Sequence, residues 1–256
     1  MIVEIARDGV IERREFLLVS HRGGRGFGPE NTLESLEAAL ARGVEMVETD
    51  VRMSGDGVPL IHHGPFLGLG LVARMPMREI RERAPHVPTL REYLEAAGGR
   101  CSMNLEIKRC DPEALTRVLE DGPAAPYLLI SSFDPDFLIS FRQTGYLSDL
   151  GLLSQFELAY DRLVHDAEEC GARVLLPVSL ATGGGLVDAA HAAGLRVIPW
   201  TVNSLESLNE MVFAGCDGVI TDRYLFFRDH LEAGPLSRDG RGAARGDAAL
   251  EARGGG

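Results

Sequence analysis

The feature that most constrains the fold is a strand-like run followed by a helix-like run, repeated along most of the chain. Short stretches rich in apolar and β-branched residues alternate with stretches in which apolar residues recur at helical spacing. Each unit takes roughly 20–30 residues, a length at which the helix has to return the chain along the sheet, so that consecutive strands run parallel. The sequence therefore predicts an α/β fold with a parallel sheet.

The number of strands favours a closed barrel over an open sheet. A (β/α)8 TIM barrel usually takes about 250 residues, which matches the 256 residues of this chain. A doubly wound open sheet is the alternative, but here polar groups follow many different strands instead of gathering at one switch point. The expected strands are residues 16–20, 46–53, 102–108, 127–132, 149–154, 172–178, 196–202 and 217–221.

Helical spacing and a change of composition set the expected domain boundaries. Residues 233–256 are rich in Gly, Ala and Arg and have almost no large apolar residues, so we expect a disordered tail there. Residues 1–232 are expected to form one barrel domain. The expected helices are residues 32–42, 77–83, 89–97, 112–121, 135–144, 159–170, 184–193 and 204–214.

Charge and cysteine content narrow the class of protein. The formal net charge of −12 argues against nucleic-acid binding, and an anionic substrate would need a metal or a few placed cations. No apolar run approaches the length of a membrane span, and the N-terminus lacks a signal-peptide core. Four scattered cysteines without a CxxC pair favour reduced thiols and a cytoplasmic protein. No particular oligomeric state is indicated.

Three acidic residues in strand-like runs form a candidate metal site. Glu48 and Asp50 are two residues apart, so their side chains point to the same face of a strand. Glu106 occupies a similar place in the next predicted barrel strand. Carboxylates without Cys or closely spaced His suit a hard divalent cation such as Mg²⁺ or Ca²⁺. On their own, Glu48 and Asp50 are better explained as surface charges on an edge strand.

Histidines and cations lie close to the same strand ends. His21 directly follows the first predicted barrel strand, and His62 and His63 follow an extended run at 58–62. Because imidazole titrates near neutral pH, two such residues could act as general base and general acid. Arg22 and Lys108 could bind a substrate phosphate or form salt bridges with the acidic cluster.

The motifs that carry these residues resemble those of the glycerophosphodiester phosphodiesterases, a family of metal-dependent (β/α)8-barrel enzymes. The matching segments occur in the family's order between about residues 17 and 223, and it is this order that makes the resemblance specific. The segments are HRGGRGFGPENT, VETDV, DGVPLIHHGP, NLEIK, ISSF, WTVN and GCDGVITD.

The resemblance implies a role for each matching acidic and catalytic residue. Glu48, Asp50 and Glu106 would hold the divalent cation. His21 and His63 would be the acid–base pair, with His21 expected as the base and His63 as the acid. The implied reaction is hydrolysis of a glycerophosphodiester to an alcohol and a phosphomonoester such as glycerol 3-phosphate.

The resemblance also implies which residues bind the substrate and support the site. Arg22 and Lys108 would bind the phosphate, and Glu30 and Asn31 would hold the first loop in place. Trp200, the only tryptophan, would border the substrate pocket, although packing in the core explains it equally well.

The chain departs from the family pattern after the second histidine. Where the family has His-Asp, this chain has His63-Gly64, and the polar run common after that point is absent. His62 is a rival for His63, but counting from the Asp-Gly turn at 56–57 favours His63.

Two alternative activities follow from these departures. A lysophospholipase D-type enzyme would need an apolar groove, which Leu67, Leu69, Leu71 and Val72 could supply. A degenerate barrel would bind a phosphodiester without turnover, and Gly64 is the feature in its favour.

Overall fold

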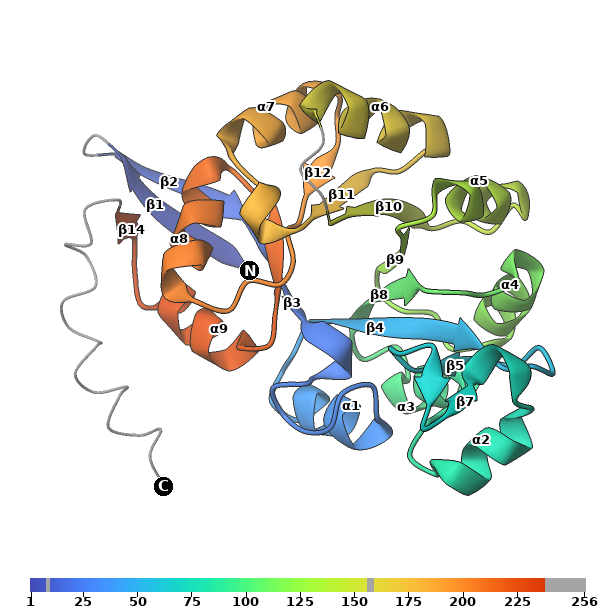
Figure 1. Ribbon diagram of the computed structural model, residues 1–256. Coiled ribbons are helices and arrows are strands. Elements are labelled where there is room, and N and C mark those ends of the chain that lie inside the picture. Colours follow the sequence, from blue (N-terminus) through green and yellow to red (C-terminus); the bar gives the residue numbers. More distant parts are fainter. Residues whose placement is uncertain (8–9, 156–158, 238–256) are drawn as a thin grey trace.

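A computed structural model of the protein describes residues 1–7, 10–155 and 159–237, and it is a (β/α)8 barrel (Figure 1). Eight parallel strands form a continuous path, which confirms the predicted fold class. In spatial order the strands are β12 (Arg196–Val197), β11 (Val174–Pro177), β10 (Asp149–Ser154), β9 (Leu128–Ser132), β8 (Ser102–Ile107), β4 (Met46–Met53), β3 (Leu17–Ser20) and β13 (Gly218–Thr221).

Backbone hydrogen bonds join the two ends of this path and close the barrel. The Asp217 N–H donates to the Val197 carbonyl over 2.8 Å, and the Ile220 N–H donates to the Pro199 carbonyl over 2.9 Å. The Val202 N–H donates back to the Ile220 carbonyl over 2.9 Å. The expected strand at 196–202 is therefore mostly an extended segment, with β12 covering only its first two residues.

Helices cover the outside of the barrel (Figure 1). Thr89 caps one of them with a reciprocal bond to Glu92, which explains why that helix begins where the sequence predicts. The covering helices are α1 (Leu33–Leu40), α3 (Leu90–Ala97), α4 (Pro112–Asp121), α5 (Pro135–Gln143), α6 (Tyr160–Cys170), α7 (Gly184–Ala192), α8 (Leu205–Ala214) and α9 (Tyr224–Glu232).

The two-residue period of the strands sorts their side chains into an inner and an outer layer. The outer layer packs against the helices. The inner layer is a separate apolar cluster formed by Val19, Met46, Leu129, Leu153, Val174, Leu176, Ile198 and Ile220. Two residues further along four of these strands, the inward positions are His21, Glu48, Trp200 and Asp222. The chemistry-bearing residues therefore continue the inner layer toward the carboxyl end of the barrel.

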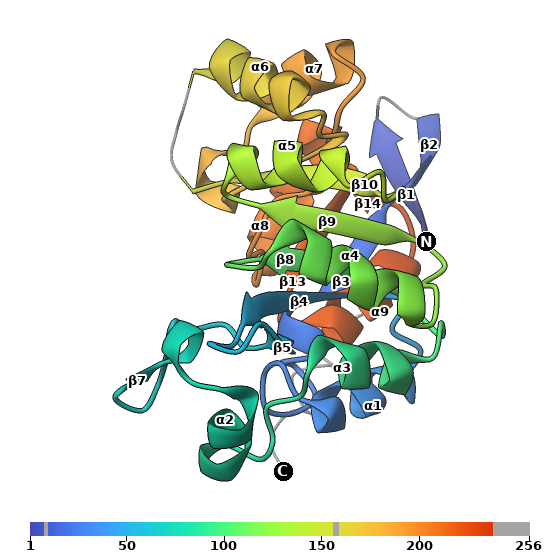
Figure 2. The same ribbon diagram turned by 90° about the vertical axis from the view of Figure 1, so that its right-hand side faces the viewer.

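An antiparallel hairpin at the N-terminus was not predicted. It consists of β1 (Ile2–Arg7) and β2 (Val10–Glu15), and it lies at the end of the barrel where the chain begins (Figure 2). Charged residues and a mostly exposed second strand concealed it in the sequence. The short strand β14 (Leu236–Ser237) pairs with β1, so the described chain continues past the predicted boundary at residue 233. The remainder of the predicted tail, residues 238–256, lies outside the described residues.

An insertion between β4 and α3 lies at the opposite end of the molecule from this hairpin (Figure 2). Its small core is built from Leu60, Val72, Met75, Ile80, Ala84 and Val87. The insertion comprises β5 (Pro59–Ile61), β6 (Phe66–Leu67), β7 (Gly70–Leu71), the 3-10 turn η2 (Val72–Arg74) and α2 (Met77–Arg83). Within the described chain, no helix combines the length and apolar character needed to cross a membrane.

Candidate active site

The three predicted carboxylates meet inside the barrel. β4 pairs with β8 in a register that places Asp50 opposite Glu106, and Glu48 lies two residues before Asp50 on the same face. One oxygen from each side chain lies within 4.8 Å of the others. All three residues are buried, and β4 lies between β3 and β8, so the alternative of surface charges on an edge strand is wrong.

The environment of these carboxylates fits a hard divalent cation. Burial and the neighbouring charges of Asp50 and Glu106 raise the pKa of Glu48 well above its usual range. The buried Oε1 of Glu48 has no hydrogen-bond partner among the described residues, although its Oε2 accepts the backbone N–H of Arg22 over 2.8 Å. A bound cation would neutralise the repulsion among the three carboxylates and would give Glu48 Oε1 the partner that it lacks. Three carboxylate ligands are typical of Mg²⁺ or Ca²⁺ sites.

Asp50 differs from Glu48 because donors surround it. Burial acts to raise its pKa, but hydrogen bonds from His63 and Asn31 and the charge of Lys108 lower that pKa far below its usual range. Asn31 donates to Oδ2 over 2.8 Å, and the Lys108 ammonium lies 3.3 Å from Oδ1. Asp50 is therefore ionised before any cation binds.

The raised pKa of Glu48 predicts an unusual dependence of stability on pH in the metal-free protein. An unfolded glutamate has a pKa of about 4.3. Above that value the unfolded chain releases a proton that folded Glu48 retains, so the free energy of unfolding falls as the pH rises. In EDTA, thermal unfolding should give a lower midpoint at about pH 7 than at about pH 5, and Glu48→Gln should reduce the difference. Equal pH dependence in the two proteins would contradict this assignment.

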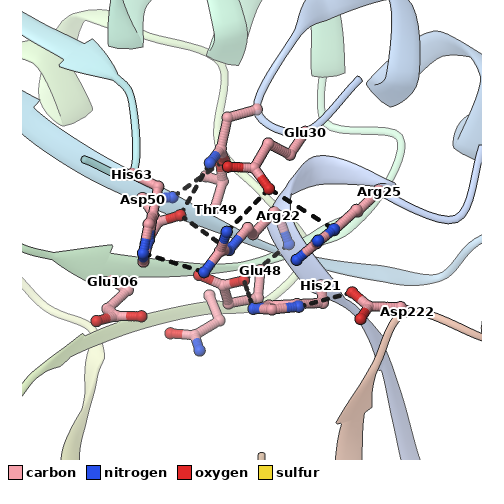
Figure 3. Close-up of polar contacts among 12 residues, drawn as sticks. His21, Arg22, Arg25, Glu30, Glu48, Thr49, Asp50, His63, Glu106 and Asp222 are labelled. Carbon is pink, nitrogen blue, oxygen red and sulfur yellow. Dashed lines mark hydrogen bonds and ion pairs between the residues drawn. The ribbon is translucent and has the colours of Figure 1, made fainter. Parts of the chain in front are cut away.

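The structure places His63, and not His62, against the acidic cluster (Figure 3). The Nδ1 of His63 donates to Asp50 Oδ1 over 3.1 Å. The Nε2 of His62 instead bonds to the Phe66 carbonyl within the insertion, over 3.1 Å. The register obtained by counting from the Asp-Gly turn therefore agrees with the geometry.

His21 lies between Glu48 of the carboxylate cluster and a second carboxylate, that of Asp222. Its Nε2 lies 3.9 Å from Glu48 Oε2, and its Nδ1 donates to Asp222 Oδ1 over 2.7 Å (Figure 3). The bond to His21 lowers the pKa of Asp222 against the effect of burial. Asp222 was not predicted as a site residue. Two signals could have identified it: it ends the family segment GCDGVITD, and it lies two residues after Ile220, an inner-layer residue.

Arg22 links the first loop to both the cluster and His63. It adopts a left-handed backbone with φ of 49°, which aims its N–H at Glu48. Its guanidinium donates to Glu30 over 2.8 Å and to His63 Nε2 over 3.0 Å. Burial lowers the pKa of Arg22, but Glu30 and Asp50 outweigh that effect and raise it. Glu30 thus contacts Arg22 within the first loop, and Asn31 connects the loop to Asp50.

The loop can approach the barrel this closely because residue 23 is glycine. Gly23 has φ of +66°, and a Cβ there would collide with the hydroxyl of buried Tyr93. A side chain there would be strained by the positive φ and would force the loop or Tyr93 to shift.

Lys108 and Trp200 meet through an aromatic residue that was not predicted. The Lys108 ammonium bonds to Glu106 and lies 5.5 Å from the ring centroid of Phe133. The Phe133 ring packs edge-on against Trp200 at 5.6 Å. Trp200 also donates from Nε1 to the Leu176 carbonyl over 2.8 Å. Trp200 therefore packs on the inner layer of the barrel while remaining partly exposed at its carboxyl end.

The absence of a carboxylate at residue 64 does not leave His63 without an acidic partner. Asp50 accepts from its Nδ1, and the Nε of Arg52 donates to its carbonyl over 2.9 Å. A Cβ on Gly64 would make only ordinary contacts, so a side chain could be accommodated there. His63 thus has an acidic partner and a fixed backbone carbonyl although residue 64 is glycine.

Known proteins of similar sequence belong to one enzyme family. Residues 21–225 match the profile of the Glycerophosphoryl diester phosphodiesterase family. A glycerophosphodiester phosphodiesterase of Caldanaerobacter subterraneus subsp. tengcongensis is 28% identical over 229 residues, covering 80% of this chain and 93% of the relative.

Solved structures show the same similarity. An Oleispira antarctica phosphodiesterase in complex with the product sn-glycerol-3-phosphate superposes with a TM-score of 0.77 at 26% identity, covering 85% of this chain and 97% of that one. A glycerophosphodiester phosphodiesterase of Thermotoga maritima superposes with a TM-score of 0.72 at 28% identity, covering 86% and 100%.

Proposed function

Because the chain belongs to the glycerophosphoryl diester phosphodiesterase family and is a phosphoric diester hydrolase, we propose that it hydrolyses glycerophosphodiesters to an alcohol and glycerol 3-phosphate. The observation that carries this proposal is the buried carboxylate cluster, with His63 hydrogen-bonded to Asp50 and the Nε2 of His21 3.9 Å from Glu48. A small phosphodiester is the substrate class that such a site suits, and the Oleispira relative binds the corresponding product.

Glu48, Asp50 and Glu106 would hold a divalent cation, Mg²⁺ or Ca²⁺. The cation, when bound, supplies positive charge that stabilises the transition state at phosphorus. Arg22 and Lys108 would bind the phosphate oxygens, which requires them to exchange part of their present carboxylate contacts for the substrate. Phe133 and Trp200 would border the pocket.

His21 and His63 would move the protons. His21 would take a proton from the nucleophile, a water or a neighbouring substrate hydroxyl, and His63 would protonate the leaving alkoxide. In the structure Arg22 occupies the Nε2 of His63. A substrate phosphate that draws Arg22 away would free this nitrogen to take up a proton from solvent, and His63 would then give that proton to the leaving group.

The compartment and the metabolic setting belong to the same proposal. All four cysteines are free thiols, three of them buried, which supports a cytoplasmic enzyme. Glycerophosphodiesters are the deacylated forms of phospholipids, so the activity would belong to lipid metabolism.

The alternative activities receive less support from the described residues. Val72 is buried in the insertion core, Leu67 packs against that core, and Leu69 is fully exposed, so these residues do not line one apolar groove. This arrangement counts against the lysophospholipase D-type reading. A non-catalytic barrel would not need His21 and His63 bonded to separate carboxylates.

One assay separates these readings. Purified protein is incubated with glycerophosphocholine, glycerophosphoethanolamine or a lysophospholipid, in the presence of Mg²⁺, Mn²⁺, Ca²⁺ or EDTA. We expect glycerol 3-phosphate from the two glycerophosphodiesters, and EDTA should abolish its formation. Hydrolysis of the lysophospholipid, without hydrolysis of either glycerophosphodiester, would favour the lysophospholipase D-type enzyme. No hydrolysis of any substrate, beside an active relative, would leave only the binding role.

A further inference from the structure

We propose that Asp222, held by Asn203, is the positioning residue for His21. The seam that β13 forms with β3 on one side and with residues 196–203 on the other thus also orients a catalytic histidine. This inference rests on the proposed function, because it assigns His21 a part in the reaction. No role was assigned to Asp222 or to Asn203 from the sequence.

The seam brings Asp222 to His21 by strand register. β13 pairs in parallel with β3, with Thr221 opposite Ser20, so the next residue of each strand emerges at the same level. At that level the Nδ1 of His21 and Oδ1 of Asp222 are 2.7 Å apart, across 201 residues of sequence. Since a carboxylate only accepts, Nδ1 carries the proton and Nε2 is left facing Glu48.

Asn203 fixes the carboxylate from the other side of the seam. Its Nδ2 donates to Asp222 Oδ2 over 2.8 Å, while its Oδ1 accepts the Asp222 backbone N–H over 2.9 Å. The same Oδ1 accepts the Thr221 hydroxyl over 3.2 Å. One side chain thus holds both the carboxylate and the backbone of Asp222, and little rotation remains for the group that His21 meets.

The first loop packs on the same residue. A Cβ at Gly26 would collide with the Asp222 carbonyl oxygen, so the glycine allows the loop that carries His21 to lie directly on Asp222. His21 is therefore held through its ring by the Asp222 side chain and through its loop by the Asp222 backbone.

The two histidines are oriented by different kinds of carboxylate. His63 is held by Asp50, which belongs to the proposed metal site, whereas Asp222 lies outside that cluster. Asp222 can therefore be changed without removing a proposed metal ligand. Carboxylates that orient metal-binding histidines through the second ring nitrogen typically contribute about tenfold to a hundredfold to affinity or activity, and we expect a loss of the same order here.

The test compares Asp222→Asn with a matched control on the same strand. Asp217 flanks the other end of β13, accepts from His191 over 2.9 Å and accepts the Val197 N–H over 2.7 Å, so Asp217→Asn disturbs an equivalent histidine pair far along the seam. With glycerophosphocholine, Asp222→Asn should lower kcat about tenfold to a hundredfold with KM changed by less than about twofold. Asn203→Ala should lower kcat less, by about threefold to tenfold. Asp217→Asn should leave kcat unchanged.

A double variant separates positioning from general damage. If Asp222 acts through His21, then His21→Ala/Asp222→Asn should be no slower than His21→Ala. A further fall in kcat in the double variant overturns the proposal, as does an equal loss of kcat in Asp217→Asn or no loss in Asp222→Asn.

The contact between His21 and Asp222 can also be tested by a measurement that does not depend on enzyme activity. ¹⁵N NMR of the His21 ring should show Nδ1 protonated in the wild type and a mixture of tautomers in Asp222→Asn. The same tautomer in both proteins overturns the positioning role even if the enzyme is active. If the wild type hydrolyses no phosphodiester but the tautomer still differs between the wild type and Asp222→Asn, the proposed function is contradicted. The positioning of His21 by Asp222 is then still supported.

Discussion

Replacing His63 with alanine should lower kcat on glycerophosphocholine by at least about a hundredfold, the usual contribution of an acid–base group. Its neighbour provides a matched control, because His62 has the same chemistry but bonds to the Phe66 carbonyl and not to the acidic cluster. His62→Ala should therefore keep kcat within about twofold of the wild type. Steady-state kinetics at saturating metal measure both values.

The leaving group identifies what His63 does. p-Nitrophenolate leaves without being protonated, so a p-nitrophenyl phosphodiester should be hydrolysed by His63→Ala with a much smaller loss than glycerophosphocholine. His21→Ala should lose similar activity on both substrates, since deprotonation of the nucleophile is needed in each case. If His21→Ala, and not His63→Ala, shows the smaller loss on the p-nitrophenyl substrate, then His21 is the acid and His63 is the base. If His62→Ala is the inactive variant, the register is wrong.

Replacing Glu48 with glutamine should abolish both metal binding and turnover while leaving the metal-free fold intact. Glu48 is buried beside two other carboxylates, so the wild type without metal carries uncompensated repulsion. The amide keeps the shape of the side chain and can still accept the Arg22 N–H. Without metal, the unfolding midpoint of the variant should equal or exceed that of the wild type at neutral pH.

The metal response then distinguishes the two proteins. Metal at about a hundred times its Kd should stabilise the wild type by about 2.7 kcal/mol, or roughly 5–10 °C for a domain of this size. Glu48→Gln should show little or none of this shift, and its kcat should fall at least about a hundredfold because a bound cation contributes several kcal/mol to the transition state.

Glu45→Gln is the control for this pair of measurements. Glu45 directly precedes β4, and its side chain is 76% exposed, so its loss should affect neither the metal shift nor kcat. A full metal-induced shift in Glu48→Gln would place the cation elsewhere. A metal shift that disappears equally in Glu45→Gln would show that charge in general, and not the cluster, is responsible.

Local periodicity explains which parts of the site could be predicted. Glu48 and Asp50 share a face because side chains alternate along a strand, and the same rule places Glu106 beside them once β8 is the neighbour of β4. The elements that escaped prediction lack such a signal. β2 is exposed over almost its whole length, and β14 is only two residues long.

By itself, the sequence determined the repeating strand–helix order, the shared face of Glu48 and Asp50, and the family to which the motifs belong. Only the tertiary structure decided that Asp222 and Asn203 hold His21, and that Phe133 joins Lys108 to Trp200. The physical reason is the range of the interactions. Periodicity and capping depend on residues two to four positions apart, whereas closing the barrel brings its first and last strands together across the whole chain.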